Sequence, residues 1–218
     1  LFVLGGGGLF QSHHGLSAAA LFSFSHSDVA VYARPVLMAQ LLGKRVLLWA
    51  QGVGPLDTSE SRAVVRRVFD SADFISVRDR ESLELLRESG VTGAIEAAPD
   101  PVWALPLEGD VTPPATPPRR VGIMVRPWDF IPQWEDRLVE AIRESLPEDV
   151  VLVWMSSQTE SVPYLSVSDR DYLRRLADRL DAYPSEWVSC DSVPDLSAQF
   201  TACDRLICMR LHGQILAL

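Results

Sequence analysis

Short apolar segments alternate with longer helical segments along almost the whole chain. The segments that favour β-structure are 1–4, 45–50, 74–77, 94–97, 121–125, 150–155, 186–190 and 205–208. Strands separated by helices of about 10–15 residues are typical of parallel sheets with right-handed crossovers. Residues 46–50 and 150–154 are apolar without alternation, as strands are when both faces of their sheet are covered. The sequence therefore predicts an α/β fold with doubly wound parallel sheets.

The helical segments are bounded by residues that cap or end helices. We expect helices over 31–42, 59–72, 80–89, 133–146, 168–182 and 195–203, and one from 211 onward. Ser59 or Ser61 is the expected N-cap of the second helix, and Asp79 is that of the third. Gly43 and Gly90 follow the first and third helices, where a glycine commonly ends a helix.

Seven prolines within residues 99–118 separate two such series of strands and helices. Repeated prolines suppress regular structure and favour an extended connector. We predict a Rossmann-like domain over 1–105, a linker over 106–119 and a second Rossmann-like domain over 120–218. Such a pair is expected to bind its ligand between the domains, beyond the strand ends. Both termini fall in apolar or helical segments, so we expect an internal piece, incomplete at both ends.

The composition argues against several classes of protein. A formal net charge of −9 makes a broad nucleic-acid-binding face unexpected, because phosphates need clustered cations. Three cysteines, all late in the chain, fit a reducing compartment better than a disulfide framework. The four histidines are scattered and no CxxC pair occurs, so no metal site is expected. No apolar run reaches the roughly 18–20 residues that a membrane span needs.

Two glycine-rich segments follow predicted strands. Gly5, Gly6, Gly7 and Gly8 come directly after the first strand, where the backbone can approach a phosphate or a sugar. A tight turn explains the same residues equally well. The second segment, 51–55, is expected to be a turn in which the glycines reverse the chain and Gln51 can bind a ligand.

Charged residues at other strand ends are further candidates. Asp100 lies between two prolines, which suits it to orient a hydroxyl or accept its proton, or to close a turn. Arg78 is expected to form a structural ion pair with an acidic neighbour, and the alternative is that it faces the cleft. Arg126 follows the first strand of the second domain, where a guanidinium can grip an anion at two points or lie on the surface.

The segment with the strongest chemical signal is Arg210-Leu211-His212, between the last strand and the last helix. An arginine and a histidine at a helix N-terminus form a compact anion pocket, with a proton donor beside it. A buried histidine and a salt-bridged arginine are the alternative. His13 and His14 lie in a loop and either face solvent or face a substrate.

Taken together, these segments resemble the polysaccharide pyruvyl transferase family. The resemblance is carried, in order, by Gly5–Leu9, Leu42–Lys44, Ala50–Pro55, Ser76–Asp79 with Ser82, Gly90-Val91, Pro99–Val102 and Met209–Gly213. It is greatest to the bacterial branch acting on cell-wall polysaccharide that anchors surface-layer proteins. His13-His14 and the segment 156–164 depart from the expected pattern and leave the acceptor open.

The resemblance implies a glycosyltransferase-B-like pair of domains, phosphoenolpyruvate as the donor and a pyruvyl ketal on a sugar as the product. Arg126, Arg210, Leu211 and His212 would bind the donor, and His212 would protonate it. Asp100, or a histidine of the 13–14 pair, would accept a proton from an acceptor hydroxyl. Gly6, Gly7, Gly8 and Gln51 would lie on the acceptor side. No cofactor or metal is expected.

Two other functions compete with this hypothesis. A nucleotide-sugar-dependent glycosyltransferase would use the same two-domain shape, and a non-catalytic module would bind a sugar or an anion without releasing phosphate. For the pyruvyl transferase we expect a cytoplasmic protein, with contact to the inner membrane face left open. Its expected acceptor is a sugar, free in a polysaccharide or linked to a lipid.

Overall fold

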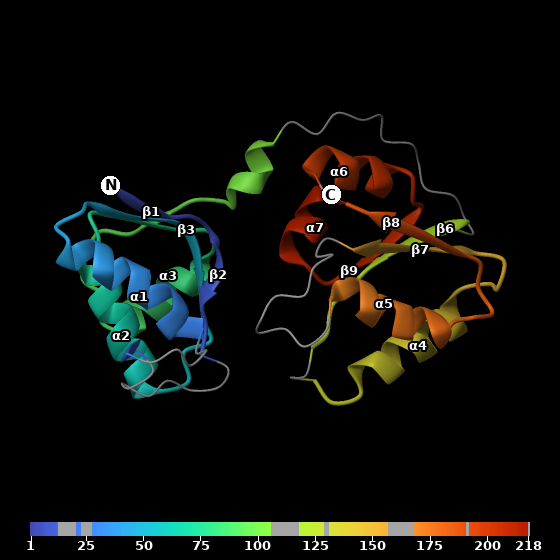
Figure 1. Ribbon diagram of the computed structural model, residues 1–218, viewed down its shortest axis with the longest axis horizontal. Coiled ribbons are helices and arrows are strands. Elements are labelled where there is room, and N and C mark those ends of the chain that lie inside the picture. The colour runs from blue at the N-terminus through green and yellow to red at the C-terminus, as the bar shows by residue number, and fades with distance from the viewer. Residues whose placement is uncertain are drawn as a thin grey trace. The chain divides into compact units, whose positions relative to one another are not determined.

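The computed structural model describes residues 1–12, 21–22, 28–105, 118–128, 131–156, 168–190 and 192–217 (Figure 1). The chain divides into two compact units, Leu1–Trp103 and Ala104–Leu218. Most of the expected linker, 106–117, lies outside the described residues. Every strand pairing in both units is parallel, which confirms the predicted α/β class. Among the described residues, no helix is long and apolar enough to cross a membrane.

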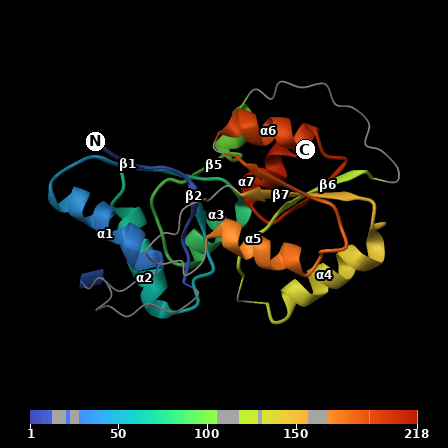
Figure 2. The same cartoon turned by 45° about the vertical axis from the view of Figure 1, so that its right-hand side comes forward.

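In the part of the first unit that the structure describes, there are one sheet and three α-helices. Its elements are β1 (Phe2–Leu4), β2 (Gly7–Phe10), α1 (Asp28–Leu41), β3 (Val46–Val53), α2 (Ser59–Asp70), β4 (Phe74–Val77), α3 (Arg80–Glu88), β5 (Glu96–Ala97) and a short 3-10 helix, Pro101–Ala104. The strand order is β1-β3-β4-β5, and β2 also pairs with β3. Helices α1 and α2 lie side by side in both views (Figures 1 and 2).

Strands β1 and β2 follow one another along the same edge of β3. Phe2 pairs with Val46, and farther along Gly8 pairs with Gly52. The interruption falls at Gly6, where an added Cβ would lie 2.7 Å from the carbonyl oxygen of Ala50. Gly7 and Gly8 are therefore strand residues, so the tight turn, one of the two interpretations of this segment, does not extend over them.

The expected turn over residues 51–55 is also wrong in its first half. Strand β3 continues through Val53, and the chain turns at Gly54, which has a φ of 112°. Gln51 is thus paired with Gly7 of β2 and Val77 of β4, and Gly52 is paired with Gly8 of β2.

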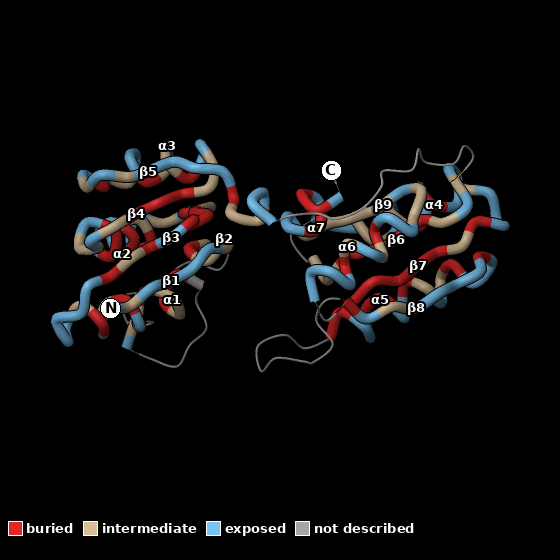
Figure 3. The backbone as a smooth tube through the Cα atoms, turned by 90° about the horizontal axis from the view of Figure 1, so that it is seen from above, coloured by how far each residue is buried: buried red, intermediate tan, exposed pale blue. Residues whose placement is uncertain are grey.

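Side chains from all three helices pack on one face of this sheet. Val36 of α1, Phe69 of α2 and Leu86 of α3 join a single core with Leu48 of β3. On the other face, Trp49 is 50% exposed. Figure 3 shows the buried segments of β3 and β4 beside exposed ones. The prediction that 46–50 is covered on both faces is therefore wrong for the described residues.

Capping agrees with the sequence at three of four helix ends. Asp79 accepts a hydrogen bond from Ser82 N at 2.7 Å and caps α3, as predicted. Gly43 and Gly90 have positive φ just after their helices, also as predicted. For α2 the N-cap is Thr58, which accepts from Ser61 N, so the expected serine cap is wrong.

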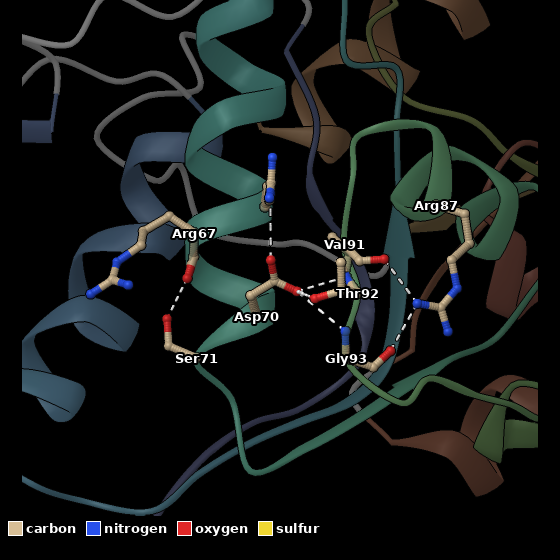
Figure 4. Close-up of polar contacts among 8 residues, drawn as sticks. Arg67, Asp70, Ser71, Arg87, Val91, Thr92 and Gly93 are labelled. Carbon is tan, nitrogen blue, oxygen red and sulfur yellow. Dashed lines mark hydrogen bonds and ion pairs between the residues drawn. The ribbon is translucent and has the colours of Figure 1, made fainter.

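The loop between α3 and β5 is tied to both neighbouring helices (Figure 4). Asp70 Oδ1, at the end of α2, accepts hydrogen bonds from Thr92 N at 2.8 Å and Gly93 N at 3.3 Å. The hydrogen bond from Thr92 lowers the pKa of Asp70. Arg87 of α3 donates to the carbonyl oxygens of Val91 and Gly93, both at 2.8 Å. These contacts fix the chain as it enters the edge strand.

The second unit is a four-stranded sheet with helices on both faces. Its elements are β6 (Arg120–Met124), α4 (Trp134–Ser145), β7 (Val151–Ser156), α5 (Asp169–Asp178), β8 (Ser185–Ser189), α6 (Val193–Thr201), β9 (Arg205–Cys208) and α7 (Leu211–Leu216). Helices α4 and α5 cover one face and α6 and α7 the other (Figure 1). The strand order is β8-β7-β6-β9.

This order contains one reversal. The chain moves outward from β6 to β8 and then returns to the free side of β6 to add β9. The two strands that are adjacent at such a point are followed by helices that cover opposite faces of the sheet. This leaves a crevice at the carboxyl ends of the two strands. The reversal lies between β6 and β9.

Candidate functional site

The strand reversal places two arginines next to each other. Met124 and Cys208 pair across the reversal, and Met209 N donates to Met124 O at 3.0 Å. Arg126 and Arg210 each lie two residues beyond these partners. The sequence predicted both arginines at strand ends, and the sheet order brings those two strand ends together.

The electrostatics of Arg126 show that the two guanidinium groups influence each other. Burial, followed by the positive charge of Arg210, lowers the pKa of Arg126. The carboxylate of Asp169 partly offsets both effects. An arginine still stays protonated at neutral pH, so the like charges persist and favour an anion beside them.

Asp169 is a site residue that the sequence reasoning missed. It is the first residue of α5, its side chain is 7% exposed, and it accepts a hydrogen bond from Arg210 Nη2. Ser168 caps the same helix by accepting from Asp171 N at 3.1 Å. The signal that would have found Asp169 is its position at the start of the helix after β7, since that helix begins at the same edge of the sheet.

Two cations and one carboxylate leave this site with one net positive charge. Trp128 adds a further contact, because the guanidinium carbon of Arg126 lies 5.3 Å from the centre of its ring. The electron-rich face of the ring attracts the cation and so helps to orient the guanidinium group. The two guanidinium groups are therefore partly buried, and their forked donors could bind an anion.

His212 and Leu211 begin the helix that follows. Leu211 is the first residue of α7, and both side chains are exposed. Gly213 follows them, and an added Cβ there would lie 2.4 Å from Cys208 Sγ and 3.2 Å from Met124 Sδ. The absence of a side chain at Gly213 lets α7 pack directly on β6 and β9. This packing fixes the first turn of α7, which carries His212.

The thiols of Cys203 and Cys208 contribute to packing and are poor candidates for a catalytic nucleophile. Burial raises the pKa of Cys208, and it raises that of Cys203 to about 11. Thiols with raised pKa values are poor nucleophiles at neutral pH.

A second feature lies in the first unit, at the carboxyl ends of β2, β3 and β4. It is a cavity of about 480 Å³. Its lining residues are Gly8, Gln11, Gly52, Val53, Gly54, Pro55, Arg78, Asp79, Glu81, Ser82 and Leu85. The cavity is polar on the side of Arg78 and has carbon-rich groups at Pro55 and Leu85.

Asp100 is bound to the arginine of this cavity. Arg78 Nη1 donates to Asp100 Oδ2 at 3.0 Å, and Val102 N donates to Asp100 Oδ1 at 3.1 Å. The side chains of Arg78 and Asp100 are 12% and 8% exposed. The predicted ion pair of Arg78 is present, and its partner is the candidate residue Asp100.

The other predicted acceptor-side residues have different surroundings. Gln51 is fully buried, and its amide nitrogen donates to Leu4 O at 2.8 Å and Trp49 O at 3.0 Å. Gly7 has a φ of 139°. His13 and His14 lie outside the described residues. The ligand-binding roles of all these residues stay predictions.

Comparison with known proteins gives one finding. The model of the family called polysaccharide pyruvyl transferase matches residues 1–218, the whole chain. Neither a curated protein nor a solved structure matches. The resemblance inferred from the ordered motifs is thereby confirmed. This match over every residue shows that the chain belongs to the polysaccharide pyruvyl transferase family.

Proposed function

We propose that the protein transfers the enolpyruvyl unit of phosphoenolpyruvate to a sugar and releases phosphate. The observation that supports this most is the Arg126–Arg210 pair beside a single carboxylate. The donor carries a carboxylate and a phosphate a few bonds apart. Two forked cations at neighbouring strand ends suit such a molecule, because each guanidinium can take one anionic group.

The proposed reaction needs an acid and a base. His212 gives a proton to the methylene carbon of the donor, which makes C2 electrophilic. One sugar hydroxyl adds to C2, the C2–O bond to phosphate breaks, and a second hydroxyl adds. The two sugar hydroxyls release two protons. One of them restores the proton that His212 gave to the methylene carbon, and the other leaves with the phosphate. The product is a cyclic ketal bearing a methyl group and a carboxylate.

The arginines are proposed to stabilise charge during this sequence. When the C2–O bond breaks, negative charge develops on the bridging oxygen, which leaves with the phosphate, and fixed cations stabilise that charge without reorganisation. This scheme uses no cofactor.

The proton acceptor for the sugar hydroxyl is proposed to be Asp100 or a histidine of the 13–14 pair. Asp100 already accepts from Arg78 and Val102 N. Comparing Asp100→Asn with a His13→Ala/His14→Ala double variant separates the two. Only the variant that lacks the base should show a turnover number lowered by about 10²–10⁴-fold.

We further propose that the acceptor belongs to cell-wall polysaccharide, or to a lipid-linked precursor of it, of the kind that anchors surface-layer proteins. The reaction would take place in the cytoplasm, with the inner membrane face as one location of a lipid-linked acceptor. A glycosyltransferase-B-like arrangement of the two units belongs to the same proposal.

Phosphate release tests the function. The chain is incubated with phosphoenolpyruvate and a panel of sugar acceptors, and inorganic phosphate and the ketal methyl signal are followed together. We expect equal amounts of both, dependent on acceptor. Turnover of a UDP-sugar in place of phosphoenolpyruvate would contradict the proposal.

A further inference from the structure

We propose that the cavity of the first unit binds one neutral sugar ring through the Arg78 guanidinium, with the paired glycines Gly8 and Gly52 as its floor. The identity of this ligand as an acceptor sugar rests on the proposed function. The cavity, its arginine and its charge are observations of the structure alone.

Arg78 uses little of its hydrogen-bonding capacity. Nη1 bonds Asp100, whereas the buried Nε has no hydrogen-bond partner among the described residues. Its nearest carboxylate oxygen, Asp79 Oδ2, lies 3.8 Å away, beyond hydrogen-bond length. A buried guanidinium donor without a partner is costly. Nη2 forms no hydrogen bond with a described residue and is not enclosed as Nε is, so it is the donor that a ligand with oxygen acceptors can reach.

The two glycines let the guanidinium lie directly on the sheet. Gly8 and Gly52 pair across β2 and β3. A Cβ on Gly52 would lie 2.8 Å from Arg78 Nη2 and 2.9 Å from Nε, and one on Gly8 would lie 3.7 Å from Nη2. A side chain at Gly52 would occupy the place that Arg78 now fills, whereas a Cβ at Gly8 would make an ordinary contact with Arg78 and would lie 2.5 Å from Gln11 Nε2. The sequence interpretation of Gly52 as a simple turn residue is therefore replaced by a packing role under Arg78.

The charge of the lining favours a neutral ligand over an anion. Among the lining residues that the structure describes, Arg78 is the one cationic side chain, and Asp79 and Glu81 are anionic. Asp100 already neutralises Arg78. A phosphate or a carboxylate would therefore meet net repulsion. Hydroxyl groups can accept from Arg78 and donate to the carboxylates, since each is both donor and acceptor.

The size and the apolar wall also suit a sugar. A volume of about 480 Å³ falls within the range of small-molecule sites. Pro55 and Leu85 offer carbon surface to the C–H face of a ring, while Gln11 and Glu81 offer polar groups to its edge. These groups come from strand ends and from the start of α3, within a single unit.

The test is saturation-transfer NMR of the chain without phosphoenolpyruvate. The probes are methyl β-D-glucopyranoside, methyl β-D-galactopyranoside and N-acetylglucosamine. We expect ring-proton saturation for at least one of them, undiminished by added inorganic phosphate. Gly52→Ala should weaken that binding by about tenfold, the usual effect of losing one charge-assisted hydrogen bond.

Two further variants make the result unambiguous. Gly93→Ala is the matched control, because its Cβ would make only an ordinary 3.6 Å contact with Ile75 Cδ1. It should bind like the unchanged chain. Arg78→Lys keeps the charge beside Asp100 but loses the fork and Nε, so it should weaken binding similarly if Gly52→Ala does not fold.

Absence of saturation with all three probes, or equal binding by Gly52→Ala, would overturn the proposal. Displacement of the sugar by phosphate would do the same, since it would make the cavity an anion site. Failure here is distinct from failure of the proposed function. Wild-type ketal formation by Gly52→Ala removes the inference alone, whereas sugar binding without phosphate release removes the function alone.

Discussion

Arg210 donates to the carboxylate of Asp169, a residue 41 positions earlier in the chain, at the same edge of the sheet as Arg126. The carboxylate is almost fully buried, whereas Arg210 is 27% exposed. One part of the Arg210 side chain is therefore held by the protein, and another part stays exposed. The pairing also lets two like charges share one site, which would otherwise be unfavourable.

Asp169 is expected to act through Arg210. Asp169→Asn should lower kcat/KM for phosphoenolpyruvate by about tenfold, because Arg210 loses a charged partner that orients it. The double-mutant cycle with Arg210→Ala is the measurement. In that background Asp169→Asn should change kcat/KM less than about twofold.

The matched control for this cycle is Asp171→Asn. Asp171 lies on the same helix and contacts Ser168 and Arg174 rather than the arginines of the site. Its substitution should leave kcat/KM unchanged. Full additivity of Asp169→Asn and Arg210→Ala would show that Asp169 does not work through Arg210.

His212 is predicted to be the general acid. His212→Ala should lower turnover by about 10²–10⁴-fold with little change in the urea midpoint of unfolding, because the side chain is exposed. Steady-state phosphate release and urea unfolding check the two halves. An unchanged turnover number removes His212 from the mechanism.

Gly213 is predicted to be required for the packing of α7. Gly213→Ala places a Cβ within 2.4 Å of Cys208 Sγ, so the helix must shift. The free energy of unfolding in urea should fall by about 1–3 kcal/mol. In Gly93→Ala, where the added Cβ has space, the free energy of unfolding should fall by less than half as much. Equal losses would mean that α7 does not pack as tightly on β9 as described.

Asp70 is predicted to contribute to acid sensitivity. Its pKa is lowered in the folded state, so its contribution to stability is present above the ordinary value of 3.8 and is lost as the pH falls through the folded value. Asp70→Asn should reduce stability at neutral pH and flatten the loss of stability below pH 3.8.

Urea unfolding at several pH values measures this dependence. Asp57→Asn serves as the control, because no hydrogen bond or ion pair joins its carboxylate to another described residue. It should keep the acid dependence of the unchanged chain. A variant at Asp70 with that same dependence would contradict the assigned role of the loop contacts.

Much of the fold follows from local sequence signals, and the exceptions have local causes. The strand before Arg210 and the cap at Asp79 could be predicted, because an apolar run and a capping residue act over a few positions. Strand β2 could not be predicted, because its glycines have no side chains whose alternation would mark a strand. Gln51 could not be recognised as buried, since its partners Leu4 O and Trp49 O are fixed by sheet pairing.

The site was predictable in part for the same reason. Arg126 and Arg210 could each be placed at a strand end from the sequence. Their proximity depends on the order of strands, which long-range pairing of β6 with β9 decides. The part that Asp169 plays depends on that order too, so its place at the start of α5 after β7 is the one sign of it in the sequence.

Calorimetric titration with phosphoenolpyruvate tests the central claim most directly. Arg126→Ala and Arg210→Ala should each weaken binding by at least about tenfold, since each removes a charge-assisted contact to the donor. Arg137→Ala, which removes an exposed positive charge from α4, should bind like the unchanged chain. Equal affinity of all three variants and the unchanged chain would contradict the account, because the donor would then bind elsewhere.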